Sequence, residues 1–427
     1  MKRFFMVFMA IAMLVSLLGC MPKTEETAKV QEITVMVCRP IETKFGFERL
    51  VKQFEEETGI KVNMQIYEET DANVEQYRTT ATAELISGTG ADVYQVDWLS
   101  YNELGEKGLL YDFTPILGVD DVLNNEKMLM NIIKSLSLGD AVYGIPLSFQ
   151  LPGWYSRTES GMQQTQAWGS YTWPEFMELM RTSDTPSRTI DYDREIFRYW
   201  LLDEWESWVY EDNPEQPLNT QAIRGALEQV SAWADERLCW DSMAGNVDAL
   251  SGEDIFYSSY DLGESLLALI YPLSEMYSVP IPSVHAQGEA RYPILPHQMY
   301  GINSASKNKD AAVAFIKFMA ENYDYIKYRE WFAYTHRANM REHCEIYFNA
   351  HPALASKLDE GNDIYKIMDQ MIEKLDTMRF AVVREGINDV LDIITSEADI
   401  YFYERKSANE AVTSMEATLK LYLKERM

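Results

Sequence analysis

The N-terminal third of the chain has the hydrophobic pattern of alternating strands and helices. Residues 33–37 (ITVMV) form a short apolar run rich in β-branched side chains, which is typical of a buried strand. An amphipathic helix is predicted next, because four apolar residues have the i, i+3, i+4, i+7 spacing: Phe47, Leu50, Val51 and Phe54. Residues 60–66 then alternate between apolar and polar side chains, as a strand does. This β-α-β order predicts two parallel strands joined by a crossover helix.

The rest of the chain continues this α/β pattern and then becomes rich in helix. The further predicted elements are helices over residues 73–87, 173–181, 221–234 and 310–321, a strand over residues 92–97, and a tail that is helical from residue 363 onward. Thr172 suits the cap of the helix that begins beside it, and Pro174 suits its first turn. The predicted fold class is therefore α/β with a helical C-terminal tail.

The first twenty residues have the features of an export signal. Lys2 and Arg3 precede an apolar stretch, residues 4–18, which is too short to span a bilayer. The stretch ends in Leu17-Leu18-Gly19-Cys20, which resembles the bacterial lipoprotein signal, where a small residue precedes a cysteine that becomes lipid-modified. We therefore expect residues 1–19 to be a signal peptide. Cys20 would carry the lipid, with residues 20–32 as a tether, so the mature chain would lie on the extracytoplasmic face of a bacterial membrane.

Composition narrows the classes of function. The chain has 427 residues and a net charge of −29, which disfavours binding to the polyanionic backbone of a nucleic acid. It holds 10 Trp and 26 Tyr, residues whose apolar faces and polar tips suit a binding surface. The cysteines that follow Cys20 have no close spacing, so either one disulfide or three buried thiols is possible for Cys38, Cys239 and Cys344.

No motif predicts a metal, a cofactor or a catalytic centre. The histidines and the cysteine at 336, 343, 344 and 351 match no zinc-site spacing, and they are interpreted as a solvated surface. The sequence lacks Gly-x-Ser-x-Gly and His-Glu-x-x-His motifs. We therefore predict that the protein is not an enzyme.

The order of four stretches resembles a known family. They are residues 47–67 (FERLVKQFEEETGIKVNMQIY), residues 85–117, residues 139–157 followed by TWPEFMELM (172–180), and residues 300–320 (YGINSASKNKDAAVAFIKFMA). In this order they resemble the extracellular solute-binding proteins of ATP-driven importers, in particular the sugar-binding proteins that include maltose-binding proteins.

The resemblance implies two α/β lobes with a ligand cleft between them, which close by a hinge motion. The N-terminal lobe would comprise residues 33–145 plus 293–340, and the C-terminal lobe residues 146–292 plus 341–427. The implied partners are a small solute, a membrane permease of an ATP-driven importer, and the membrane itself through the lipid on Cys20. The protein would act as a monomer.

Candidate ligand-binding residues follow from the strand ends and from the resemblance. Ligands of open α/β sheets bind beyond the carboxyl ends of parallel strands, which points to Arg39, Asp97 and Trp98. The resemblance implies further candidates at the first crossing between lobes and in the later chain: Gln150, Trp154, Tyr155, Tyr271 and Arg379.

Each of these candidates has a structural alternative. Trp98 could cover the sheet edge, Asp97 could cap a helix, and Arg39 and Arg379 could form surface salt bridges. Trp154 and Tyr155 are adjacent, so in an extended segment one of them would face the core. Tyr271 could be half-buried at a strand end, and it begins Tyr-Pro-Leu where maltose-binding relatives tend to have Gly-Pro-Trp.

The sequence leaves three functional hypotheses. The first is a lipid-anchored binding protein for a sugar or oligosaccharide. The second keeps the fold but binds a polyamine or another small cation, which the acidic charge would suit. The third is a surface-anchored glycoside hydrolase, which would need two carboxylates roughly 5–10 Å apart across a cleft. Stacked aromatics with amides and Arg in the cleft would favour sugar, whereas clustered carboxylates without Arg would favour a cation.

Overall fold

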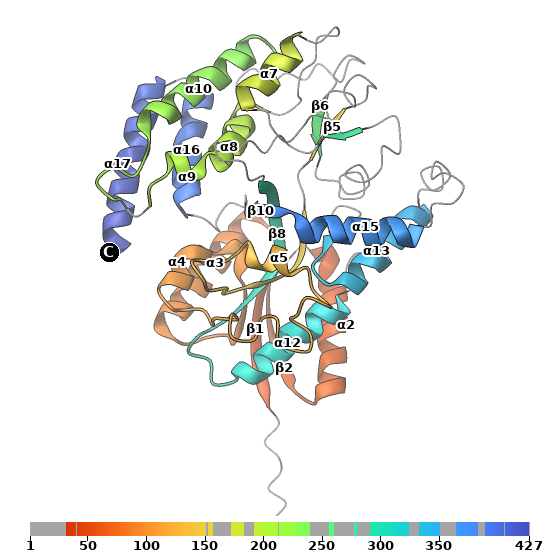
Figure 1. The fold of residues 1–427 in the computed structure, drawn as a ribbon. Helices are drawn as coiled ribbons and strands as arrows, with labels where there is room; N and C mark the ends of the chain where they lie inside the picture. The colour runs from red at the N-terminus through yellow and green to blue at the C-terminus, as the bar shows by residue number, and fades with distance from the viewer. Residues whose placement is uncertain are drawn as a thin grey trace, which may run out of the picture.

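The computed structural model describes most of the chain and divides it into two lobes (Figure 1). The described residues are 31–39, 41–150, 153–156, 172–182, 192–211, 213–239, 256–259, 277–279, 291–323, 333–350, 364–382, 389–404 and 406–426. No helix among these residues is long and apolar enough to cross a membrane. We call the lower lobe of Figure 1, which holds β1, the first lobe, and the upper lobe, which holds α16 and α17, the second lobe.

The first lobe begins with the predicted β-α-β unit. Its early elements are β1 (Glu32–Arg39), α2 (Ile41–Thr58), β2 (Lys61–Glu68), α3 (Asp71–Ser87), β3 (Val93–Gln95), the short 3-10 helix η1 (Val96–Trp98) and α4 (Tyr101–Glu106). Strand β1 lies parallel to both neighbours, with Val35 opposite Met64 of β2 and Val93 of β3. The predicted crossover helix and parallel pair are confirmed.

Later parts of the chain complete the same sheet. These strands are β4 (Ile145–Gln150), β8 (Arg291–Ile302), β9 (Ala333–Tyr334) and β10 (Arg379–Val382). The sheet order is β2-β1-β3-β8-β4-β9, and β10 pairs with the start of β8. Strand β8 is antiparallel to both β3 and β4. Strand β4 therefore runs in the same direction as β1 and β3.

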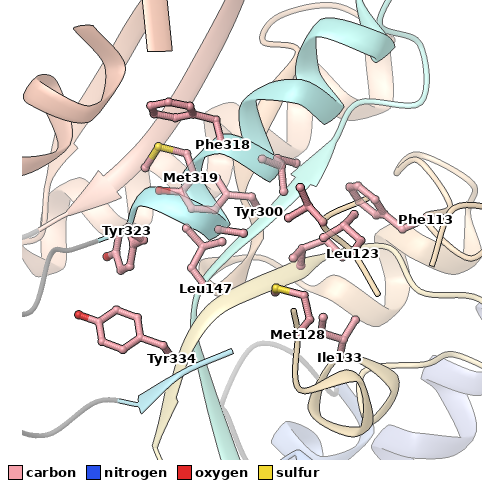
Figure 2. Packing of buried hydrophobic residues seen from close by; sticks show 14 of the residues in the cluster. Phe113, Leu123, Met128, Ile133, Leu147, Tyr300, Phe318, Met319, Tyr323 and Tyr334 are labelled. Carbon is pink, nitrogen blue, oxygen red and sulfur yellow. The ribbon is translucent and has the colours of Figure 1, made fainter. Parts of the chain in front are cut away.

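Both faces of this sheet are covered by apolar side chains. Residues Ile33, Val35 and Val37 of β1 belong to one buried cluster, and Met36 and Cys38 belong to another. The alternation explains why the whole strand is apolar: it is buried on both faces. The helices α5 (Met130–Lys134), α12 (Lys309–Asn322), α13 (Arg337–Ala350) and α15 (Ile364–Thr377) complete the lobe. Figure 2 shows the first cluster between β4, β8 and α12.

The second lobe is mainly helical. It contains α7 (Trp173–Thr182), α8 (Asp193–Asp203), α9 (Trp205–Trp208), α10 (Thr220–Asp235), α16 (Asp389–Glu404) and α17 (Ala408–Arg426). A small antiparallel sheet has the order β6 (Phe256–Ser259), β5 (Gly153–Ser156), β7 (Tyr277–Val279). Its core joins the middle of the chain to the tail, since Leu227 of α10, Leu391 of α16 and Met415 of α17 are all fully buried in one cluster.

The predicted strand over residues 92–97 is shorter in the structure. Strand β3 ends at Gln95, and residues 96–98 turn into η1. The reason is the Asp97 carboxylate, which accepts hydrogen bonds from the backbone N–H groups of Gln298 (3.1 Å) and Met299 (3.3 Å). This contact bends the chain where the sheet would otherwise continue.

Part of the helical tail packs on the first lobe. Ile372, Leu375 and Met378 belong to the core cluster around β1, although the sequence-based division placed residues 341–427 in the second lobe. Within the part of the tail that the structure describes, α16 and α17 are the helices that join the core of the second lobe. An apolar stripe predicts that a helix packs, but not which lobe it packs on.

The interpretation of the histidine cluster as a solvated surface is wrong for two of its members. His336 is 8% exposed and His343 is 5% exposed. The His343 ring packs edge-on against the Tyr334 ring, with 5.7 Å between ring centres. Burial lowers the pKa of His343 to about 4, because a charged imidazolium would lose its hydration there. Both histidines lie inside the first lobe as uncharged packing residues.

The cysteines that the structure describes in full are buried in different lobes. Cys38 lies in a cluster of the first lobe and Cys239 in the core of the second. Burial raises the pKa of the Cys38 thiol to about 12, which keeps it protonated and unreactive at neutral pH. The side chain of Cys344 lies outside the described residues.

Candidate functional site

Three strands of the first lobe end at the edge of the sheet that faces the second lobe. Strands β1, β3 and β4 run in the same direction, so Arg39, Asp97 and Gln150 follow or end them at this edge. His297 of the antiparallel β8 lies at the same edge, since it pairs with Ser148 of β4. This edge therefore carries side chains that follow or belong to four strands.

Arg39 lies inside the first lobe. It is 1% exposed, its guanidinium carbon lies 4.2 Å above the centre of the Phe47 ring, and its Nη2 donates to the Tyr323 hydroxyl at 3.3 Å. Burial removes the alternative of a surface salt bridge. Its guanidinium stabilises the packing of α2 and the end of α12 beneath the edge, and its predicted contact with ligand stays a prediction.

Asp97 is also 1% exposed, and its carboxylate accepts hydrogen bonds from backbone N–H groups. Both of its carboxylate oxygens accept N–H groups of β8, and Gln95 Nε2 lies 3.4 Å from Oδ2. Gln298, one of the residues that it holds, has a positive φ of 51°, a conformation that non-glycine residues rarely adopt. The Asp97 carboxylate therefore holds the backbone of β8, whereas the structural alternative was that it caps a helix after it. A direct role of Asp97 in ligand binding stays a prediction.

Trp98 lines a cavity between the two lobes, which we call the Trp98 cavity. Its volume is about 390 Å³, within the range of small-molecule sites. Its walls come from α3 and the segment after β3 in the first lobe, and from α16 in the second: Arg78, Thr82, Trp98, Leu99, Ser100, Asp392, Thr395, Ser396 and Asp399. Arg78 Nε donates to the Trp98 carbonyl oxygen at 2.9 Å, which fixes the backbone that presents the indole.

One face of α16 supplies the opposite wall. Asp392, Thr395, Ser396 and Asp399 have the i, i+3, i+4, i+7 spacing of a single helix face. The other face carries Leu391, Ile394 and Ala398, which are buried in the second lobe. The helix therefore presents a stripe of carboxylates and hydroxyls to the cavity. The sequence analysis did not predict these four residues, because a polar helix face is usually solvated.

A hydrogen-bonded contact joins the lobes beside this cavity. Asp389, at the start of α16, accepts hydrogen bonds from the hydroxyls of Tyr422 (2.7 Å to Oδ2) and Ser100. Burial raises the pKa of Asp389, and these two donors partly offset that effect. Ser100 belongs to the first lobe and Asp389 to the second, so this carboxyl connects the two lobes in the observed arrangement.

Gln150 lies at the end of β4, half-buried at the lobe boundary. Its Oε1 is 3.0 Å from Nε2 of His297, which aligns both side chains along the edge. Neither residue lines the Trp98 cavity as the described residues define it. The contact of Gln150 with ligand stays a prediction.

The remaining candidates are placed only by their backbone or not at all. Trp154 and Tyr155 lie in β5, where they pair with Ser258 and Tyr257 of β6. Arg379 begins β10, opposite Arg291 of β8, and is exposed. Tyr271 and Cys20 lie outside the described residues. Of the eight predicted binding residues, the Trp98 cavity contains Trp98 alone among its described walls.

The comparison with protein families decides what kind of protein this is. The family model of the bacterial extracellular solute-binding proteins matches residues 44–322, which is more than half of the chain. The chain belongs to this family. The predicted resemblance is confirmed, and this solute-binding protein is a binding protein of a transport system rather than an enzyme, as the sequence predicted.

Solved structures support the two-lobed fold of this solute-binding protein. It is similar to an extracellular solute-binding protein of family 1 from Alicyclobacillus acidocaldarius, with a TM-score of 0.60 and 14% identity over 92% of this chain and 98% of that chain. The sugar-binding protein of Xanthomonas citri has a TM-score of 0.59 and 14% identity, over 93% of this chain and 98% of that chain.

A third similar structure is a solute-binding protein of Agrobacterium radiobacter in complex with ribitol. It has a TM-score of 0.57 and 13% identity over 92% of this chain and 99% of that chain. At such low identity these likenesses establish the fold, and the predicted α/β two-lobed class is confirmed. No curated protein sequence matches this chain.

Proposed function

We propose that this solute-binding protein captures a sugar or a polyol outside the cell and delivers it to an ATP-driven importer. The observation that carries the proposal is the Trp98 cavity, where an indole lies together with an arginine and with hydroxyls and carboxylates of α16. The resemblance to sugar-binding proteins supports the same reading.

The chemistry of the cavity fits a polyhydroxylated ligand. A sugar ring has apolar C–H faces, which pack against an aromatic side chain such as Trp98, and a rim of hydroxyls. Carboxylates such as Asp392 and Asp399 accept hydrogen bonds from pairs of hydroxyls, while Arg78 donates to ring and hydroxyl oxygens. The presence of Arg78 disfavours a polyamine or another small cation here, because it would repel that ligand.

The proposed mechanism is closure of the lobes around the ligand. The cavity has walls from both lobes, so a bound ligand would contact both and stabilise the arrangement in which they meet. The closed form would then dock on the permease. The similar proteins that bind ribitol or sugar support this reading of the fold.

The first experiment is thermal unfolding of the mature protein, residues 21–427, with a panel of sugars, polyols and polyamines. A true ligand at about 100 times its dissociation constant should add about 2.7 kcal/mol of stability. Trp98→Leu should abolish the shift for the sugar or polyol, whereas Tyr403→Leu, an exposed aromatic on the far end of α16, should leave it unchanged. Stabilisation by polyamines alone would overturn the proposed ligand class.

The proposed anchorage rests on Cys20 and is tested separately. Cells that express the full chain with a palmitate label should incorporate the label and retain the protein in the membrane fraction. Cys20→Ala should lose both. Membrane retention of the alanine variant would contradict a lipid anchor at this position. Gel filtration of the mature protein with light scattering tests the proposed monomer.

A further inference from the structure

A second cavity lies between the lobes, next to the first in the chain but separate from it. We call it the Trp205 cavity. Its volume is about 520 Å³, larger than that of the Trp98 cavity, and the two share no lining residue. Its walls include α4, α9 and β10, and also the segment that follows α5 (Figure 1). The chain passes directly from one cavity to the other, since Ser100 lines the first and Tyr101 lines the second.

Aromatic rings make up much of the wall of the Trp205 cavity. Tyr101 and Tyr143 come from the first lobe with their rings edge-to-face, 6.5 Å apart, and Phe380 comes from β10. The Tyr101 hydroxyl is fully used, because it donates to Leu136 O at 3.1 Å and accepts from Tyr143 N at 2.8 Å. Tyr101 is fully buried, so it supports the wall from behind, and the half-buried rings of Tyr143 and Trp205 are what the cavity offers to a ligand.

Carboxylates lie among these rings, one from each lobe. Glu106 ends α4 in the first lobe, and Glu211 follows α9 in the second. Glu211 is oriented by the Trp205 indole, whose Nε1 donates to Oε1 at 3.2 Å. Both glutamates are exposed, so they lie at the opening while the better buried Tyr101 and Phe380 lie deeper. Among the residues that the structure describes, no lysine, arginine or histidine lines this cavity.

The charged groups of the Trp205 cavity are carboxylates without a described cationic side chain, whereas the wall of the Trp98 cavity includes an arginine. The faces of aromatic rings carry partial negative charge and attract cations, most strongly for Trp. Two carboxylates at the opening add to this field, within a chain of net charge −29. We propose that the Trp205 cavity binds an organic cation with an apolar body, of the alkylammonium class, at a site distinct from the sugar or polyol site.

The test compares choline with its uncharged carbon analogue, 3,3-dimethylbutan-1-ol, which has the same shape. In calorimetric titrations of the mature protein at low salt, choline should bind about tenfold more tightly than the analogue. Glu211→Gln and Glu106→Gln should each weaken choline binding about threefold or more. The matched control is Glu56→Gln, an exposed glutamate of α2 that removes the same charge at a remote surface and should change nothing.

Further variants separate the site from a general surface effect. Trp205→Leu should abolish choline binding, and Trp205→Phe should retain part of it because a ring remains. Equal binding of choline and the uncharged analogue, equal weakening by Glu56→Gln, or no binding of choline would each overturn the proposal. Competition between choline and the sugar or polyol found with the thermal panel would also overturn it, because the two would then share one site.

Discussion

The hydroxyl of Tyr422 in α17 donates to the Asp389 carboxylate at the start of α16, with 2.7 Å between the oxygens. Because the same carboxyl also accepts from Ser100 of the first lobe, the last helix of the chain helps to orient the contact between the lobes. Tyr422 lies 33 positions after Asp389 in the sequence. The C-terminal helix is therefore part of the lobe boundary as well as of the second core.

Tyr422→Phe is expected to destabilise the protein by about 2 kcal/mol. The variant keeps the ring but leaves a largely buried carboxylate without one of its donors, and hydrogen bonds to charged groups are stronger than neutral ones. Urea unfolding measures the change. Tyr403→Phe, at an exposed tyrosine of α16, is the control and should be neutral. Equal stability of the two variants would contradict the role given to this hydrogen bond.

Thr395→Ala is expected to weaken the binding of the sugar or polyol about tenfold, with little loss of protein stability. The Thr395 hydroxyl donates to the Leu391 carbonyl at 2.9 Å and lines the Trp98 cavity, so its removal takes a polar group from the binding wall. The control is Thr413→Ala in α17, whose hydroxyl makes the same kind of contact with the Asn409 carbonyl at an exposed site. Unchanged affinity of the Thr395 variant would place the ligand elsewhere.

Asp97→Ala is expected to cost about 3 kcal/mol of stability, measured by chemical unfolding. The variant leaves the backbone N–H groups of Gln298 and Met299 without their acceptor in a buried turn. Asp112→Ala is a fair comparison, since that carboxylate accepts the N–H of Thr114 at 2.9 Å close to the surface, where water can replace it. A loss of ligand affinity without a loss of stability would instead support the predicted contact of Asp97 with ligand.

The buried His343 makes the stability of the first lobe dependent on pH. Its pKa is about 4 in the folded protein and about 6.5 when unfolded, so the unfolded chain takes up a proton first as the pH falls. The stability that its neutral ring contributes is complete above about pH 6.5 and is lost progressively toward pH 4, by about 3 kcal/mol. His343→Phe should flatten this part of the stability curve. An unchanged slope would mean that other groups cause it.

Much of the first lobe could be predicted because its signals are local. The apolar run of β1, the helical spacing in α2 and the alternation in β2 each show which side chains of that element are buried, and each pattern lies within the element itself. The early end of β3 could not be predicted in this way. It depends on hydrogen bonds from Gln298 and Met299, which lie about two hundred residues further along the chain.

The candidate site was predictable only where it follows a strand. Trp98 ends η1, the short helix that follows β3, and the strand-end rule places it at the boundary of the lobes. The polar face of α16 gave no comparable signal, because serine, threonine and aspartate on a helix are usually solvated. They become part of a cavity only when the first lobe packs opposite them, and the sequence of α16 does not specify that arrangement.

Strand β8 has a consequence for how the protein folds. It pairs with β3 and β4 in the centre of the sheet, yet about two hundred residues separate Val93 from its partner Ile302. Until β8 has been synthesised, β3 has an unpaired edge of backbone groups open to other chains. Such distant pairing slows folding and leaves the early chain prone to aggregation. The first lobe therefore cannot complete its sheet while only the first part of the chain has been made, and β3 stays open to wrong partners until β8 is present.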